Sequence, residues 1–240
     1  MYRYNTGLSI IDNHFQGIHA ASNILILTPP LSHAEHLAYM LARPMDGEWS
    51  IFLSTDERAS DVVTTLKRLG ADRHHIGVID AITKCSVPTL SDTSRAKFVT
   101  SPMDLTGMGI KFSRMAEDMW KESVNADPGG PLPPPLRFCI NSVSTLLMYS
   151  RLEVAYRFLH VITNRVKKLE GIGVYILNNE SFDDKTLSTI KQLMTMIIEV
   201  KSVDVGMSMQ WYFRIVGING TTTQWVQYHM EDGQLVVDML

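Results

Sequence analysis

The chain has few of the features that mark secreted, membrane-spanning or nucleic-acid-binding proteins. Its only two cysteines, Cys85 and Cys139, are far apart, which predicts reduced thiols and not a disulfide framework. No run of 18 apolar residues is present, and the opening segment carries Asp12, His14 and Gln16 where a signal peptide would need an apolar block. A formal net charge of −3 offers no basic face to nucleic acid. We therefore expect a soluble, cytoplasmic protein that binds neither nucleic acid nor a membrane.

What the chain does have is the composition of an ordinary globular domain. Apolar residues make up 45% and charged residues 20% of the 240 positions, a length that fits one large domain. We predict a single domain over residues 1–240. The segment ADPGGPLPPPL (126–136), with five prolines, is predicted to be a surface loop and not a linker, because strand patterns resume on both sides of it.

Short apolar runs alternate with segments of helical spacing. Strands are predicted at 23–28, 49–55, 75–82, the start of 137–147, 173–179 and 196–201. Helices are predicted at 32–43 (with Ser32 as its N-cap), 58–70, 100–123, the end of 137–147, 151–171 and 183–194. The tail alternates polar and apolar residues and carries Asn219-Gly220 and Asp232-Gly233, which predict antiparallel hairpins. Continuous apolar strands separated by helices predict a mostly parallel sheet covered on both faces.

Two compositional features leave alternatives open. The 14 methionines are dense in 103–119 and 194–209, and methionine fills irregular cores as readily as it forms adaptable interfaces. Arg165, Lys167 and Lys168 form a small basic group, which suits the C-terminal end of a helix better than a DNA-binding patch.

Five segments carry a resemblance to a known family: TGLSIIDNHFQGI (6–18), FLSTDE (52–57), VTSPMDLTGMGI (99–110), FCINSVSTLL (138–147) and RIVGINGT (214–221). In order and spacing they resemble the KaiC-like branch of the RecA-type ATPases, a group common in archaea. The resemblance implies an α/β, RecA-like P-loop NTPase fold. Such a fold has a mostly parallel central sheet, helices on both faces and an antiparallel C-terminal extension.

The resemblance places the phosphate-binding loop at TPPLSHAE, which begins at Thr28. The family pattern G-x-x-x-x-G-K-[ST] uses glycines to bring backbone N–H groups to the phosphates and lysine to neutralise them. Here Thr28 and His33 replace the glycines, Ala34 the lysine and Glu35 the hydroxyl, while Leu31 fills an inner position. Each lost charge-assisted hydrogen bond costs about 1.5–3 kcal/mol, so ATP binding in the family's manner is not expected.

Two other places in the resemblance also lack the family's residues. Asn141 stands where the family has the strand carboxylate that orders magnesium, and Gly217 and Asn219 stand where it has Lys-x-Arg. Asp56 and Glu57 alone keep the position of the acidic pair that would activate water. A solvated strand end is the favoured interpretation of this pair over a catalytic one.

His33 and His36 lie three residues apart at the start of a predicted helix, with Glu35 between them. This spacing could supply two metal ligands, but zinc takes three or four and no partner motif is evident. We therefore expect surface or capping histidines, with no metal and no other cofactor.

The preferred hypothesis is a non-catalytic, pseudo-ATPase domain acting in regulation or assembly through protein contacts. Its partners would be active RecA- or KaiC-like relatives, a signalling protein, or further copies of itself. One alternative is a divergent ATPase or small-ligand binder that uses Asp56, Glu57 and Asn141 around the old nucleotide crevice. Another is a recombination mediator of the RecA-paralogue type, which would bind DNA in a salt-sensitive way.

Overall fold

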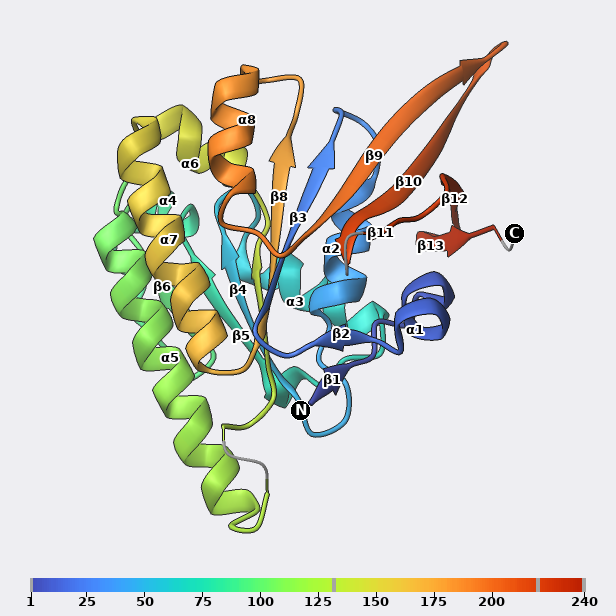
Figure 1. Cartoon of the computed structure of the whole chain (residues 1–240). Helices are drawn as coiled ribbons and strands as arrows, with labels where there is room; N and C mark the ends of the chain where they lie inside the picture. Colours follow the sequence, from blue (N-terminus) through green and yellow to red (C-terminus); the bar gives the residue numbers. More distant parts are fainter. Residues whose placement is uncertain (1, 131–132, 219–220, 239–240) are drawn as a thin grey trace.

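The computed structural model describes residues 2–130, 133–218 and 221–238. One large sheet runs through the molecule (Figure 1), in the order β13-β12-β10-β9-β3-β8-β7-β4-β5-β6 with β11 beside β10. Its parallel strands are β3 (Ser22–Thr28), β4 (Trp49–Ser54), β5 (Ile76–Asp80), β6 (Ala96–Phe98), β7 (Leu136–Ile140), β8 (Ile172–Asn178) and β9 (Met196–Val205). The antiparallel end consists of β10 (Ser208–Ile218), β11 (Thr221–Thr222), β12 (Val226–Glu231) and β13 (Gln234–Val237). The predicted parallel sheet with an antiparallel extension is confirmed.

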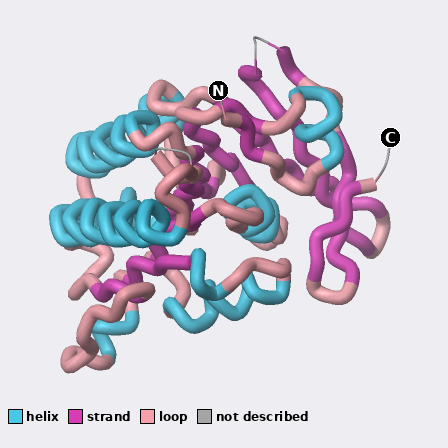
Figure 2. Tube along the Cα trace, turned by 90° about the horizontal axis from the view of Figure 1, so that it is seen from below, coloured by secondary structure: helices cyan, strands magenta, loops and turns pink. Residues whose placement is uncertain are grey.

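Helices cover both faces of the sheet (Figure 2). One core contains side chains of α1 (Ser9–Phe15), α2 (Ala34–Ala42) and α3 (Ala59–Arg68); the other contains side chains of α5 (Leu105–Ala126), α6 (Val143–Tyr149), α7 (Leu152–Lys168) and α8 (Asp184–Lys191). The central strand β3 serves both cores, because Ile24 and Ile26 point to the first and Leu25 and Leu27 to the second. Burial on both faces explains why this strand reads as a continuous apolar run.

Several short elements have no counterpart among the predictions. They are β1 (Arg3–Tyr4), β2 (Ile18–His19), α4 (Thr83–Ser86), a 3₁₀ turn (Arg73–His75), and α1 and β6. Each is too short to display a helical or strand period, so only its tertiary contacts define it. In α1, for example, the Asp12 carboxylate accepts hydrogen bonds from the backbone N–H groups of Thr6 and Gly7.

Two predicted helix starts were wrong. Helix α2 begins at Ala34, and its N-cap is His33 in a left-handed conformation (φ 55°), not Ser32. Helix α5 begins at Leu105, not near residue 100, because the Asp104 carboxylate caps the Gly107 N–H at 2.7 Å.

The methionines divide between the two predicted roles. Met108, Met115 and Met119 of α5 are buried against the sheet, whereas Met207 and Met209 of the β9–β10 hairpin are exposed. Core packing therefore accounts for these three methionines of the first segment, whereas Met103 of the same segment is exposed, as are the two hairpin methionines of the second.

Loops agree with most of the turn predictions. Asp232 and Gly233 join β12 to β13 with φ of 50° and 75°, as a two-residue hairpin turn requires. Asn219-Gly220 lies outside the described residues. In the proline-rich segment Asp127 and Pro128 are exposed, but Pro134 and Pro135 are buried where the chain enters β7. None of the helices in the described ranges is long and apolar enough to cross a membrane.

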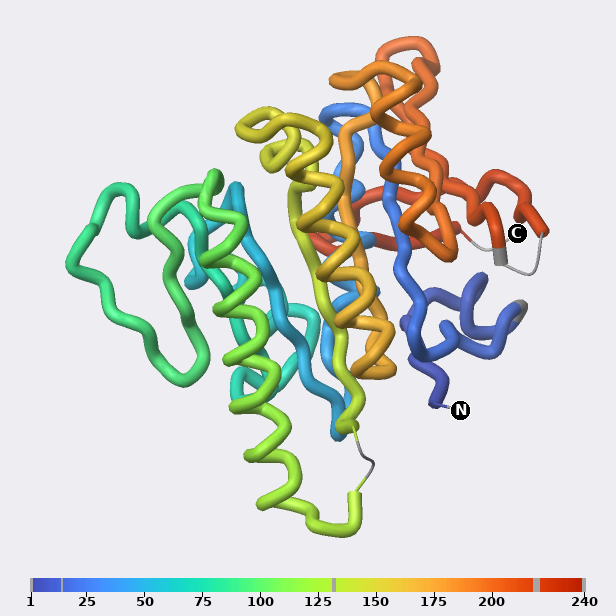
Figure 3. The backbone as a smooth tube through the Cα atoms, turned by 60° about the vertical axis from the view of Figure 1, so that its left-hand side comes forward, coloured from blue at the N-terminus to red at the C-terminus, as the bar shows by residue number. Residues whose placement is uncertain are grey.

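Helices α5 and α7 lie side by side on one face (Figure 3). Arg165 of α7 donates to the Gly109 carbonyl oxygen at 2.9 Å and to the Ser113 hydroxyl at 2.5 Å, both on α5. This guanidinium is therefore used in helix packing, as the helix-end interpretation of the basic group favours.

A buried ion pair fixes the end of the sheet at which the parallel strands begin. Arg137 at the start of β7 is fully buried, and its guanidinium contacts the Glu48 carboxylate at 2.5 and 3.1 Å. It also donates to the carbonyl oxygens of Leu41 and Asn5 at 2.7 and 2.6 Å. Four segments distant in sequence thus meet at one side chain.

Removing Glu48 should therefore destabilise the whole domain. Glu48→Ala leaves the Arg137 charge buried and uncompensated, and we expect it to lower the free energy of unfolding by about 3–5 kcal/mol. Urea unfolding measures the change. The matched control is Glu117→Ala, which breaks an exposed pair with Lys121 (2.6 Å) and should leave the midpoint almost unchanged. Equal losses in both variants would contradict the assigned role.

Candidate functional site

A polar cavity of about 730 Å³ lies where β3, β4, β7 and β8 end. In parallel α/β sheets this edge is where ligands bind. Six residues singled out from the sequence line it together: Thr28, Glu35, His36, Asp56, Glu57 and Asn141. The predicted site residues on β3, α2, β4 and β7 thus meet in space.

The loop after β3 is closed by its own polar groups and by the C-terminal sheet. The Thr28 hydroxyl contacts the Ser32 hydroxyl, and Tyr228 of β12 donates to the Ser32 carbonyl oxygen at 2.5 Å. Leu31 (φ 58°) and His33 (φ 55°) both adopt the left-handed conformation that bulky residues rarely take. The Leu31 side chain is 83% exposed. Side chains thus surround a loop that, in the resemblance, would be bare backbone.

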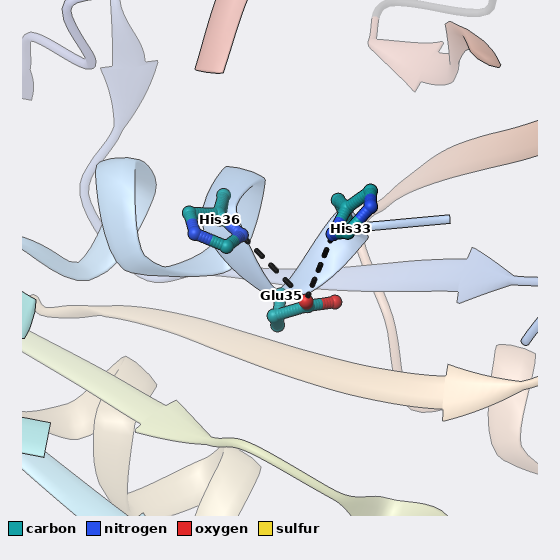
Figure 4. A group of neighbouring side chains, drawn as sticks. All are labelled: His33, Glu35 and His36. Atoms are coloured by element: carbon teal, nitrogen blue, oxygen red, sulfur yellow. Dashed lines mark ion pairs between the residues drawn. The ribbon is translucent and has the colours of Figure 1, made fainter. Parts of the chain in front are cut away.

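The first turn of α2 carries a compact group of ionisable side chains (Figure 4). The same carboxylate oxygen of Glu35, Oε1, lies 3.8 Å from Nδ1 of His33 and 3.6 Å from Nδ1 of His36. Burial opposes the Glu35 charge, but His36, the backbone and His33 outweigh it and lower the pKa of Glu35. The Glu35 carboxylate in turn raises the pKa of His36 despite its partial burial. Ala34, at the position where the resemblance has lysine, is fully buried.

Glu57 is held by side chains from two other elements. Tyr39 of α2 donates to both Glu57 carboxylate oxygens at 2.9 Å, and the Asn141 amide nitrogen donates to Oε1 at 3.3 Å. The amide also donates to the Ser54 hydroxyl at 3.1 Å. Burial, then Glu57, raises the pKa of Tyr39, so the phenol stays a donor.

The two residues of the acidic pair, Asp56 and Glu57, therefore have different environments. Asp56 is exposed, as a solvated strand end predicts, and its carboxylate accepts hydrogen bonds from the hydroxyls of Thr145 (2.6 Å) and Thr55 (3.1 Å). Glu57 is only half-exposed and belongs to the network with Tyr39 and Asn141, which a solvated strand end does not describe.

Gly217 of the tail is not among the residues that line this cavity. Gly217 lies on β10, and a Cβ there would meet the carbonyl oxygen of Thr195, whose N–H donates to Asn23 at the beginning of β3. It is therefore at the opposite edge of the sheet from the loop after β3. Asn219 lies outside the described residues.

Sequence reasoning missed three aromatic side chains of the site. Tyr39 lies on a helix for which the spacing predicts only that one face is buried. Tyr228 and Trp211 belong to the tail, where polar and apolar residues alternate. Trp211 packs edge-on against His33 with ring centroids 5.0 Å apart. A buried tyrosine needs a partner for its hydroxyl. That rule was the available signal for Tyr39 and Tyr228, but it does not name the partner.

A carboxylate at position 141 should be tolerated only when it is protonated. Asn141→Asp places a second carboxylate beside Glu57, which raises the folded-state pKa of one of them above the unfolded value near 4. The variant should lose about 1–3 kcal/mol of unfolding free energy at pH 7, and this loss should disappear as the pH falls below about 4.

Unfolding by urea at a series of pH values measures this difference. Asn125→Asp, at an exposed position near the end of α5, is the matched control and should show no such pH dependence. A loss for Asn141→Asp that is the same at pH 4 and pH 7 would mean that packing, and not charge, explains it.

Comparisons with known proteins agree with this fold. A KaiC-like protein from the hyperthermophilic archaeon Pyrococcus horikoshii OT3 shares 12% identity at a TM-score of 0.67, with 99% of each chain covered. An uncharacterized protein from Pyrococcus horikoshii, crystallised in complex with an unknown peptide, shares 14% identity at a TM-score of 0.72, covering 96% of this chain and 97% of that one. At these identities the likeness shows the KaiC-like, RecA-type fold alone.

No curated protein matches the sequence. A family model, in contrast, matches residues 21–200, which include the parallel strands β3 to β8 and the first part of β9. The chain therefore belongs to the Family of unknown function (DUF7504).

Proposed function

We propose that this chain is a non-catalytic, RecA/KaiC-like domain that acts in regulation or assembly through contacts with other proteins. One observation carries the proposal: side chains occupy the loop between β3 and α2, where ATPases of this fold bind phosphate through backbone and lysine. The internal Thr28–Ser32 contact and the Tyr228 hydroxyl bonded to Ser32 hold that loop in its closed arrangement.

The charges of the cavity also disfavour a polyphosphate. Glu35, Asp56 and Glu57 line it, and no lysine or arginine is among its lining residues in the described ranges. Glu35 already places a negative charge in the first turn of α2, the position at which a helix would stabilise a phosphate. An incoming triphosphate would thus meet repulsion in place of compensation.

The position that would order magnesium is occupied by the Asn141 side-chain amide, whose oxygen and nitrogen both already form hydrogen bonds. The Asn141 oxygen accepts from the Thr55 N–H at 2.9 Å, and its nitrogen donates to Ser54 and Glu57. Because position 141 carries no carboxylate, it does not offer magnesium the hard anionic ligand that this ion prefers.

A contact surface for a partner protein is provided by the tip of the β9–β10 hairpin. Beyond the pairing of β9 with β3 at Glu199 and of β10 with β12 at Trp211, residues 202–210 form a two-stranded arm that extends past the rest of the sheet (Figure 1). Four apolar side chains of this arm are exposed: Val203 (39%), Val205 (47%), Met207 (107%) and Met209 (43%). Exposed apolar groups of this kind mark interaction sites.

Each face of the arm carries an exposed apolar side chain. Val203 and Val205 lie on one face, and Met209, which pairs with Asp204, lies on the other. An arm with this pattern suits insertion against a partner that covers both faces. The peptide held by the structurally similar Pyrococcus protein is consistent with a protein-binding role for this fold.

A second candidate function is the binding of a small ligand other than ATP. The cavity of about 730 Å³ has the size of known ligand pockets. Its three carboxylates, Glu35, Asp56 and Glu57, favour a ligand with hydroxyl or amino donors.

Calorimetric titration with Mg-ATP tests the proposal. We expect no binding in the micromolar range, because the loss of several charge-assisted contacts weakens affinity by on the order of 10³-fold or more. Micromolar binding with turnover would reject the proposal. Micromolar binding without turnover would contradict the argument that side chains in the loop after β3 prevent ATP binding.

Polar substitution of the arm should weaken protein association without unfolding the domain. We expect Val205→Thr combined with Met207→Ser to reduce the mass of the assembly, formed with itself or with an active relative, in sedimentation velocity. Both side chains are exposed, so the unfolding free energy should change by no more than about 0.5 kcal/mol. The matched control is Val87→Thr, an exposed valine outside the arm. An unchanged assembly in the arm variant would exclude the arm as the contact.

A further inference from the structure

We propose that His33, Glu35 and His36 bind one zinc ion at the start of α2. In the part of the chain that the structure describes, this is the one place where three side chains of the histidine, cysteine, aspartate and glutamate type bring a ligand atom within 4.8 Å of one another. Zinc binding goes beyond the proposed function, because it requires neither a nucleotide nor a protein partner.

The geometry of the cluster is close to that of a zinc site. Zinc binds histidine nitrogen and carboxylate oxygen at about 2.0–2.2 Å, so two ligands of a tetrahedral site lie roughly 3.4 Å apart. The distances from the Glu35 oxygen to the two histidine Nδ1 atoms, 3.8 and 3.6 Å, exceed that separation only slightly. The two imidazoles converge on one carboxylate oxygen (Figure 4). All three ligand atoms lie within 4.8 Å of one another, so closure requires the His33 ring, whose side chain is 44% exposed and packed against Trp211, to move toward the other two ligands.

The Nδ1 atom of His36 lies within ion-pair distance of Glu35 but forms no hydrogen bond within the described residues, which points to a ligand that the cluster is suited to hold. Nδ1 of His36 is inaccessible to solvent and has no hydrogen-bond partner within the described residues, because the Glu35 oxygen at 3.6 Å is too distant. A buried polar atom without a partner is uncommon in folded proteins. A metal ion between His36 and Glu35 would satisfy the nitrogen and the carboxylate together.

The ligand set favours zinc among common metal ions. Two imidazoles and one carboxylate, with a fourth position left to water, form one of the known open zinc sites, whereas magnesium and calcium prefer oxygen ligands. Glu35 and His36 line the cavity, so the fourth position would face it. The indole of Trp211 packs edge-on against the His33 ring and limits its orientation.

The positive end of the α2 dipole opposes a cation at this place. That effect is screened near the surface, and the Glu35 carboxylate offsets it. The alternative occupant is a proton, which would leave the three side chains as a histidine–glutamate ion-pair cluster. The two cases differ in whether the cluster binds a metal ion at neutral pH.

Zinc titration of untagged, chelator-treated protein distinguishes a cluster that binds a metal ion from one that binds only a proton. We expect one zinc ion per chain by elemental analysis after dialysis, measurable affinity by competition with a chromophoric chelator, and visible absorption bands on cobalt substitution. His36→Gln and His33→Asn each remove one ligand; asparagine tolerates the left-handed conformation at position 33. Each should weaken zinc binding by at least about 10-fold, the smallest effect seen even for outer-shell partners.

The matched control is His74→Gln, which removes an imidazole paired with Glu122 at 2.8 Å outside the cluster. It should bind zinc as the wild type does. Wild-type protein that retains no zinc after dialysis would overturn the proposal. So would zinc binding that is unchanged in a folded His33→Asn or His36→Gln variant. Because two ligand variants are available, misfolding of one leaves the other to decide.

Discussion

The buried guanidinium of Arg137 is the contact on which the arrangement of the sheet depends. It joins the N-terminal segment at Asn5, the end of α2 at Leu41, the approach to β4 at Glu48 and the start of β7. A change in the register of β7 would separate the buried Arg137 charge from these partners and leave it uncompensated, which is strongly destabilising. The edge of the sheet where the strands begin is thereby fixed. The opposite edge, where the strands end, is then available for the polar side chains of the cavity.

Much of the fold was predictable because its strands are buried on both faces. The continuous apolar runs in β3, β4 and β8 carry that information locally, and helical spacing does the same for α3 and α7. The failures are local events decided by tertiary contacts. Ser32 has the residue type of an N-cap, but its hydroxyl contacts Thr28 and its carbonyl is held by Tyr228, nearly 200 positions away. No pattern within the loop reports that distant strand.

The residues that belong to the candidate site were predictable, but the hydrogen bonds between them were not. The resemblance to the KaiC-like branch placed Thr28, Glu35, Glu57 and Asn141 at strand or helix ends, and these ends meet at one edge of the sheet. That Tyr39 would reach Glu57 depends on the position of α2 over β4, which the sequence does not state. Similarly, Glu35 was regarded as a residue between two possible ligands. In the folded chain its carboxylate lies between the two imidazoles and completes the group.

Strand β10 links the projecting arm to the loop at the head of α2. The strand is continuous from Ser208 to Ile218, and its Trp211 contacts the His33 ring at the point where β12 begins to pair with it. A stiff antiparallel ribbon transmits displacement along its length better than an irregular segment does. If a protein bound at the arm, as proposed, tilted the ribbon, the Trp211 indole would move against the His33 imidazole and carry that displacement to the loop.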